Sequence, residues 1–169
     1  MPPSPPGDSA SPWQGGGEPI TPAGLEALER ELEKLQTEGR RAMSERLLAA
    51  RQLGDLSENA EYHIAKDDQA HLETRIKRLR ERLRAAVVVE ASADEKRLAF
   101  GRTAEVRDED TGKLHTWTVV GRSEADVARG MLSAESPIAS ALLGRAPGET
   151  VDVQTPRGAR RYRIERLVS

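Results

Sequence analysis

Two acidic residues, Asp55 and Glu58, have a type and spacing that suit either metal chemistry or a purely structural role. Carboxylates suit Mg²⁺, which normally takes only one or two of them from a protein and completes its shell with water and phosphate oxygens. Two acids at an exposed turn therefore need a partner macromolecule to supply the other ligands. The structural alternative is a capping box, in which Asp55 caps the next helix and Glu58 reaches back to it.

Periodic apolar residues on both sides of these acids predict two long helices. Thr21 suits the cap of the first helix and Pro22 its first position, where a missing N–H does no harm. The first seam contains Leu25, Leu28, Leu32 and Leu35, and a looser stripe continues it at Ala42, Met43, Arg46, Leu47, Ala50 and Leu53. The second contains Ala60, Ile64, Leu72, Ile76, Leu79, Leu83 and Ala86. Narrow seams on charged helices of about 30 residues predict an antiparallel coiled-coil hairpin, with Asp55 and Glu58 at its tip.

Near Val87 the pattern changes to alternating or clustered β-forming residues. We expect strands at residues 98–106, 115–121, 151–155 and 159–168, separated by turn-forming residues. Ser136 and Gly144 suit the cap and the stop of a short helix. The predicted fold class is therefore α+β. We divide the chain into a disordered Pro/Gly/Ser-rich tail (residues 1–19), a coiled-coil finger with an acidic tip (20–90) and a globular domain (91–169).

Composition narrows the functional classes. The 26 basic and 28 acidic residues leave a net charge of -2, which argues against nucleic-acid binding through bulk charge. The absence of cysteine excludes disulfides, thiolate metal sites and cysteine nucleophiles, and five aromatic residues are too few for a base-stacking platform. No apolar stretch approaches the roughly 20 residues that span a bilayer. We expect a cytoplasmic protein with no membrane partner.

The residues around the turn also carry a family signature. Residues 54–63, Gly-Asp-Leu-Ser-Glu-Asn-Ala-Glu-Tyr-His, resemble the tip of the GreA/GreB transcript-cleavage factors and fall at the predicted turn, as the family requires. Residues 133–144 resemble the family's C-terminal signature, and the resemblance extends over residues 20–168. It implies a long N-terminal antiparallel coiled coil followed by an FKBP-like α+β domain. The periodicity independently predicts the same layout.

The resemblance implies a role in transcription elongation without an enzyme activity of the chain's own. Family members bind bacterial RNA polymerase, insert the coiled coil into its secondary channel and stimulate cleavage at the 3′ end of backtracked nascent RNA. Asp55 and Glu58 match the family's two catalytic acids, which hold Mg²⁺ jointly with polymerase carboxylates. In such two-metal cleavage the cations activate the water and stabilise the leaving oxygen. We therefore expect the free chain to be a monomer that binds no metal.

Other positions follow from the same match. Ser57, Arg51 and Lys66 are expected near the RNA, although Ser57 also suits a plain turn and the two basic residues a solvated helix face. The expected polymerase-docking surface is Ser136, Pro137, Ile138, Leu142 and Leu143, with a plain core helix as the alternative. Five C-terminal arginines either contact nucleic acid or keep an edge strand soluble: Arg157, Arg160, Arg161, Arg163 and Arg166.

Three other functions stay open. A channel-binding relative that inhibits polymerase would share the fold, but such proteins differ in the tip acids. A coiled-coil adaptor predicts that removing the tip acids has only a small capping effect. Prolyl isomerase activity would follow from the FKBP-like fold, but fold does not carry activity, and the domain has few aromatic residues to line such a pocket. Within the family, the balanced charge of the finger favours GreA-like action on short backtracks over GreB-like action on longer ones.

Overall fold

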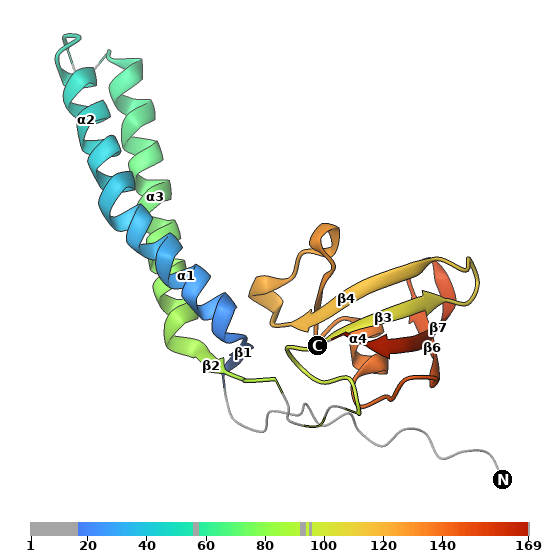
Figure 1. Cartoon of the computed structure of the whole chain (residues 1–169). Helices are drawn as coiled ribbons and strands as arrows, with labels where there is room; N and C mark the ends of the chain where they lie inside the picture. The colour runs from blue at the N-terminus through green and yellow to red at the C-terminus, as the bar shows by residue number, and fades with distance from the viewer. Residues whose placement is uncertain (1–16, 56–57, 92–93, 95, 169) are drawn as a thin grey trace. The chain divides into compact units, whose positions relative to one another are not determined.

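The computed structural model describes residues 17–55, 58–91, 94 and 96–168, so most of the expected tail lies outside the described residues. The chain divides into two compact units. The helical unit is Leu25–Ala85, and the sheet unit contains the residues from Ala86 onward together with those up to Gly24. The predicted α+β class is confirmed by this combination of a long helical region and a separate β-sheet (Figure 1).

Helices α1 (Pro22–Lys34), α2 (Arg40–Arg51) and α3 (Ala60–Ala85) dominate the N-terminal half, with a π-helical turn, η1 (Leu35–Gly39), between the first two. The start of α1 is as predicted, because the Gly24 N–H donates to Thr21 Oγ1 at 3.0 Å. The π turn was not predicted. Residues 34 and 40, on either side of it, keep right-handed helical dihedrals, so the helix continues through it. Since a π turn accommodates one extra residue, η1 shifts the phase of the apolar seam between α1 and α2.

Helices α2 and α3 lie side by side and run antiparallel (Figure 1). Arg40 Nε lies 2.9 Å from Glu73 Oε1, and Arg46 Nη1 lies 2.5 Å from Asp68 Oδ2. The later residue on α2 thus pairs with the earlier residue on α3, as antiparallel packing requires. A third pair, between Arg75 and Glu31, joins α3 to α1.

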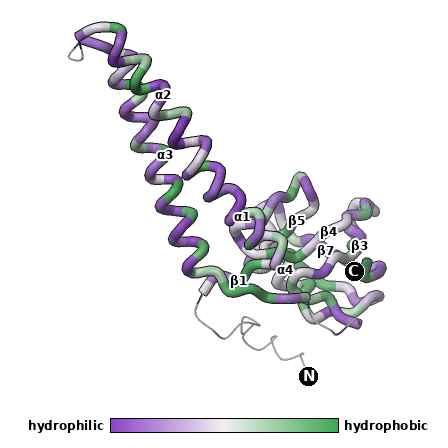
Figure 2. The backbone as a smooth tube through the Cα atoms, turned by 60° about the vertical axis from the view of Figure 1, so that its left-hand side comes forward, coloured by the Kyte–Doolittle hydropathy of each residue, from purple (hydrophilic) through white to green (hydrophobic). Residues whose placement is uncertain are grey.

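The seam between these helices is narrow, and most of their surface is hydrophilic (Figure 2). Its buried residues are Leu28, Leu47, Ala50, Ala65, Ile76 and Leu79. The seam predictions were wrong at five positions that are exposed, namely Ala42, Arg46, Leu53, Ala60 and Ile64. Ile64 is 50% exposed and Leu53 is 71% exposed. Ala65 takes the buried position instead of Ile64, a phase error of one residue. Leu53 lies beyond the end of α2 at Arg51, where helical periodicity no longer applies.

The sheet unit is built on a five-stranded sheet of order β5-β4-β3-β7-β6. Its strands are β3 (Thr103–Asp108), β4 (Leu114–Val120), β5 (Met131–Ser133), β6 (Thr150–Thr155) and β7 (Gly158–Leu167). Its short helices are η2 (Arg122–Glu124), η3 (Val127–Arg129) and α4 (Pro137–Leu142). The pairs β3–β4, β3–β7 and β6–β7 are antiparallel, whereas β4–β5 is parallel.

One core cluster fills the sheet unit, and it includes Val106, Ile164, Leu142 and Trp117. Burial alternates along the strands; in β6, for example, Val151 and Val153 are buried while Asp152 is exposed. One face of the sheet therefore covers this core. Trp117 packs in it at 8% exposure, with its ring edge-on to Tyr162 at 5.5 Å between centroids.

Some strand predictions need correction. The first predicted strand, at residues 98–106, begins only at Thr103, because Leu98 and Phe100 fill the core from a loop. β5, only three residues long, was missed. The proposal of an arginine-rich edge strand was wrong, since β7 lies between β3 and β6 inside the sheet.

A short parallel ribbon connects the start of the described chain to the end of the long helices. β1 (Glu18–Ile20) pairs with β2 (Ala86–Val88), so the predicted tail (1–19) extends two residues too far and the finger (20–90) includes residues of the sheet unit. Glu124 secures the ribbon, because its Oε2 accepts from the Thr21 N–H at 3.0 Å and from the Gly121 N–H at 3.1 Å. A three-residue ribbon that depends on partners about a hundred positions away leaves no periodic signal in the sequence.

Candidate functional site

The tip of the helical unit is the connection between α2 and α3. α2 ends at Arg51, and Gly54 has a φ of 127°, a conformation that L side chains rarely adopt. The predicted interruption of the helix at Gly54 therefore has a backbone cause. Asp55 and Glu58 are both exposed. Ser57, the third predicted residue of the turn, lies outside the described residues.

Asn59 holds the two arms together at this tip. Its Oδ1 accepts from the Tyr62 N–H at 3.0 Å, which makes it the N-cap of α3, and its Nδ2 donates to the Ala50 carbonyl oxygen of α2 at 2.5 Å. The structural alternative of a capping box that begins at Asp55 was thus wrong, because α3 begins at Ala60. Asn59 therefore braces the turn between the two arms.

The two predicted RNA-proximal basic residues flank the tip from opposite arms. Arg51 is the last residue of α2, and its guanidinium carbon lies 5.7 Å from the centre of the Tyr62 ring, within the range of a cation–π contact. Lys66, on α3, is exposed, and its Nζ donates to Gln69 Oε1 at 3.1 Å. Tyr62 therefore braces the turn through a ring contact with the opposite arm.

The chemistry of the donors at the tip fits a hard divalent cation that is shared with a partner. Among the residues that the structure describes, no group of three or more His, Asp and Glu side chains is arranged to hold a metal ion. Asp55 and Glu58 are exposed and offer two carboxylates. Mg²⁺ commonly takes only one or two carboxylates from a protein. The other ligands would come from outside this chain.

The predicted docking residues fall into three groups. Ser136 caps α4, as its Oγ accepts from the Ala139 N–H at 3.2 Å, and the exposed Pro137 occupies the first helical position. Ile138 and Leu143 are partly buried against the core. Leu142 is only 1% exposed, so its place on a docking surface was wrong. Leu142 lies on the face of α4 that packs against the core.

Sequence reasoning missed some of the residues that shape these sites. The bond of Asn59 to α2 depends on antiparallel register and not on local spacing. Glu124 lies far from Thr21 in the sequence, and no local pattern links the two. Within the described residues, no helix is long and apolar enough to cross a membrane.

The fold and the tip define a class of protein in which a long antiparallel helical pair presents two carboxylates and a separate sheet unit follows. Residues 18–88 match the family described as "Transcription elongation factor, N-terminal". Residues 93–167 match "Transcription elongation factor, GreA/GreB, C-term". The chain belongs to the GreA/GreB family of transcription elongation factors, which confirms the resemblance seen in the sequence.

Two relatives that are named Transcription elongation factor GreA support this assignment. A protein named Transcription elongation factor GreA from Jannaschia sp. (strain CCS1) is 42% identical over 149 residues, which covers 88% of this chain and 96% of that protein. One of the same name from Bradyrhizobium diazoefficiens is 45% identical over 150 residues, with 88% and 96% covered. The crystal structure of the GreA factor homolog 1 (Gfh1) protein of Thermus thermophilus is 27% identical, with a TM-score of 0.40 and 89% of this chain covered.

Proposed function

We propose that this chain is a GreA-like transcription elongation factor that binds bacterial RNA polymerase and stimulates cleavage of the 3′ end of backtracked nascent RNA. The observation that carries the proposal is the exposure of both Asp55 and Glu58 at the tip of the helical pair, within residues that match the family. Asn59, and not Asp55, accepts the hydrogen bond from the Tyr62 N–H that caps α3.

In this proposal the helical pair is a coiled coil that enters the secondary channel of the polymerase. Its polar surface suits a solvated channel, because few apolar side chains are left to bury against another layer (Figure 2). The sheet unit, which the family resemblance implies to be FKBP-like, docks at the channel rim. The docking residues are Ser136, Pro137, Ile138 and Leu143. These residues flank or form α4, and Pro137 is exposed.

Asp55 and Glu58 would supply two oxygen ligands at the polymerase active centre, where the polymerase and the RNA provide the rest. A Mg²⁺ ion held there would supply Lewis-acid chemistry, activating a water and stabilising the charge on the leaving oxygen. The two carboxylates orient this water towards the scissile phosphodiester. Arg51 and Lys66, on opposite arms, would neutralise phosphates of the extruded RNA. The reaction belongs to the assembled complex, and the free chain would not turn over.

The test is RNA cleavage in a stalled, backtracked elongation complex with saturating factor and Mg²⁺. We expect Asp55→Ala and Glu58→Ala each to slow cleavage about 100-fold, which corresponds to about 2.7 kcal/mol of lost transition-state stabilisation. Glu29→Ala is the matched control, because Glu29 is an exposed acid on α1 and not at the tip. Circular dichroism checks that all variants stay helical.

Each alternative predicts a different result. Wild-type protein that binds polymerase and only slows RNA synthesis would instead be a channel-binding inhibitor. Full activity of both tip variants would leave an adaptor without chemistry at the turn. Failure of the wild type to bind polymerase would contradict the proposal as a whole.

A further inference from the structure

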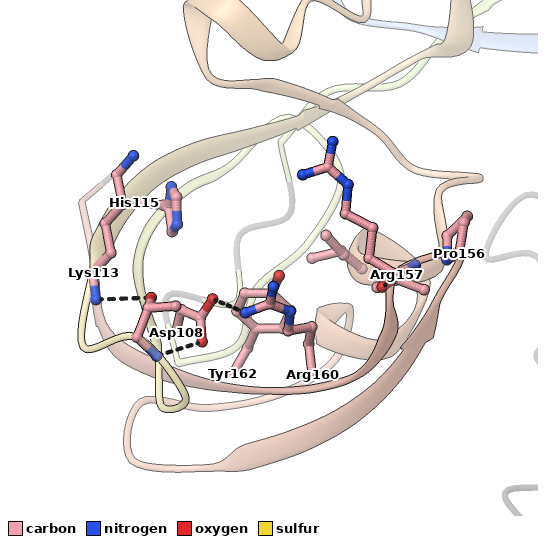
Figure 3. Close-up of a pocket in the computed structure, with 10 residues that line it drawn as sticks. Asp108, Lys113, His115, Pro156, Arg157, Arg160 and Tyr162 are labelled. Atoms are coloured by element: carbon pink, nitrogen blue, oxygen red, sulfur yellow. Dashed lines mark hydrogen bonds and ion pairs between the residues drawn. The ribbon is translucent and has the colours of Figure 1, made fainter.

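A pocket of about 450 Å³ opens at one end of the sheet, where two hairpin turns meet (Figure 3). The register explains this convergence. β3 pairs antiparallel with both β4 and β7, and β6 pairs antiparallel with β7, so the β3–β4 and β6–β7 turns lie at the same end. Backbone contacts join the first turn to β7, since the Arg161 N–H donates to Asp110 Oδ2 at 3.1 Å.

The acid in this pocket is already engaged. Asp108 Oδ1 accepts from the N–H groups of Asp110 at 2.9 Å and Thr111 at 3.2 Å, and its Oδ2 lies 3.5 Å from Arg160 Nη1. Burial alone would raise the pKa of Asp108, but these hydrogen bonds and the Arg160 charge outweigh it and hold the pKa below its ordinary value. Asp108 therefore stays ionised at neutral pH and neutralises Arg160.

Two other cations in the pocket are not neutralised in this way. Lys113, from the first turn, and Arg157, from the second, have no carboxylate within 4.0 Å in the part of the chain that the structure describes. Figure 3 shows Lys113 and His115 on one side of the pocket and Arg157 on the other. Once the Asp108–Arg160 pair is set aside, the pocket carries about two net positive charges at neutral pH, from these two side chains.

His115 adds a neutral polar group to the same wall. Its ring stacks on Trp117, with centroids 4.6 Å apart and planes 15° apart. Burial, followed by the nearby Lys113 charge, holds the pKa of His115 below its ordinary value, so the ring is neutral at pH 7 and has one N–H to donate. Bound negative charge would reverse part of this effect.

We propose that this pocket binds a small phosphate monoester, with its phosphoryl group between Lys113 and Arg157. A monoester carries a charge of about -1.5 to -2 at pH 7, which matches two uncompensated cations better than a single carboxylate or one phosphodiester does. Arg and Lys are both common phosphate ligands. The cavity volume lies in the range of small-molecule sites, and Ile138 offers an apolar wall for the remainder of the ligand.

Ligand binding in the pocket can be followed through His115, because the chain has only three histidines and their NMR signals are easily distinguished. We would titrate the full chain with inorganic phosphate and then with AMP at constant ionic strength, and follow the histidine ring resonances by NMR. We expect a saturable shift of the His115 signal and a rise of its pKa. His63 and His71, on α3, serve as internal controls and should not respond. Adenosine, which lacks the phosphate, should have no effect.

Substitutions decide whether the two cations are responsible. We expect Lys113→Gln and Arg157→Gln each to weaken AMP binding about tenfold, as loss of a charge-assisted hydrogen bond does. The matched control is Arg163→Gln, because Arg163 is an exposed residue of β7 next in the chain to the buried Tyr162, so it faces the other side of the sheet.

Three results would overturn the proposal. The first is a His115 signal that does not shift at millimolar phosphate. The second is a His115 shift in the Lys113 and Arg157 variants that equals the shift in the wild type. Alternatively, an oligonucleotide without a terminal phosphate would bind as tightly as AMP, and the surface would then be a contact for nucleic-acid backbone.

Discussion

The two units of this chain are stabilised in different ways. The sheet unit buries a continuous core that includes Val106, Leu142 and Ile164. The helical unit buries only a narrow seam, and much of the contact between its arms consists of exposed ion pairs such as Arg46–Asp68. Because the seam is narrow, large side chains such as Leu53 are exposed on the helical unit. Two acids can also lie at its tip without being buried. Stability resides mainly in one unit, and the proposed chemistry in the other.

The largest expected effect on stability is in the core of the sheet unit. Ile164 is fully buried, so Ile164→Ala should lower the free energy of unfolding of this unit by about 2–5 kcal/mol. Chemical denaturation followed by Trp117 fluorescence measures the loss. Leu53→Ala, at a 71% exposed position of the helical unit, is the control and should change stability by about 0.5 kcal/mol or less. Similar losses at both positions would contradict the contrast between the units.

The next effect is at Asp108, whose buried carboxylate is held by two N–H groups and Arg160. Asp108→Asn should cost about 1–3 kcal/mol at pH 7. Because the folded-state pKa of Asp108 lies below its value of about 3.9 in the unfolded chain, this stabilisation is present above that value and is lost as pH falls through the folded-state pKa. Unfolding measured from pH 7 down to acid should show the wild type and the variant converge. A constant difference would contradict this account.

A smaller loss is expected at the tip. Asn59→Ala removes both the cap of α3 and the bond to Ala50, and it should cost the helical unit about 0.5–2 kcal/mol. The loss should appear in helical circular dichroism. Asp55→Ala is the comparison, and it should cost the helical unit less than Asn59→Ala, because Asn59 makes both the cap of α3 and the bond to α2. The capping-box alternative predicts the reverse order of these two effects.

The smallest expected effect concerns the ion pairs between the arms. Arg46 and Asp68 are 44% and 43% exposed, so a double-mutant cycle to alanine should yield a coupling of about 0.2–1 kcal/mol that decreases with salt. A coupling well above this range would mean that charge, and not the narrow seam, holds the helical pair together.

The sequence predicts the elements that depend on local chemistry. Thr21 with Pro22, Gly54, and Ser136 with Gly144 are caps or breakers with a defined backbone role, and the helix ends that they predict agree with the structure to within a few residues. The tip acids were also predictable, since they lie in a contiguous family signature next to a glycine.

The features that were missed depend on partners distant in the sequence. Whether Ile64 or Ala65 faces the seam is set by the phase of α3 against α2, which depends on the packing of the two helices and not on local spacing. The β1–β2 ribbon and its contact with Glu124 bring together segments that lie about 70 to 100 positions apart in the sequence. The pocket between Lys113 and Arg157 exists only because β7 lies beside β3, and the alternation of either hairpin alone does not predict that neighbour.

The most direct test of the central claim is a competition in transcript cleavage. A backtracked elongation complex receives wild-type protein together with increasing amounts of the Asp55→Asn, Glu58→Gln double variant, and RNA shortening is followed in a single round. If the tip carboxylates do the chemistry and the rest of the chain provides binding, the variant will be inactive alone and will reduce wild-type cleavage in proportion to its share of the sites. A variant that shortens the RNA as fast as the wild type would contradict the claim.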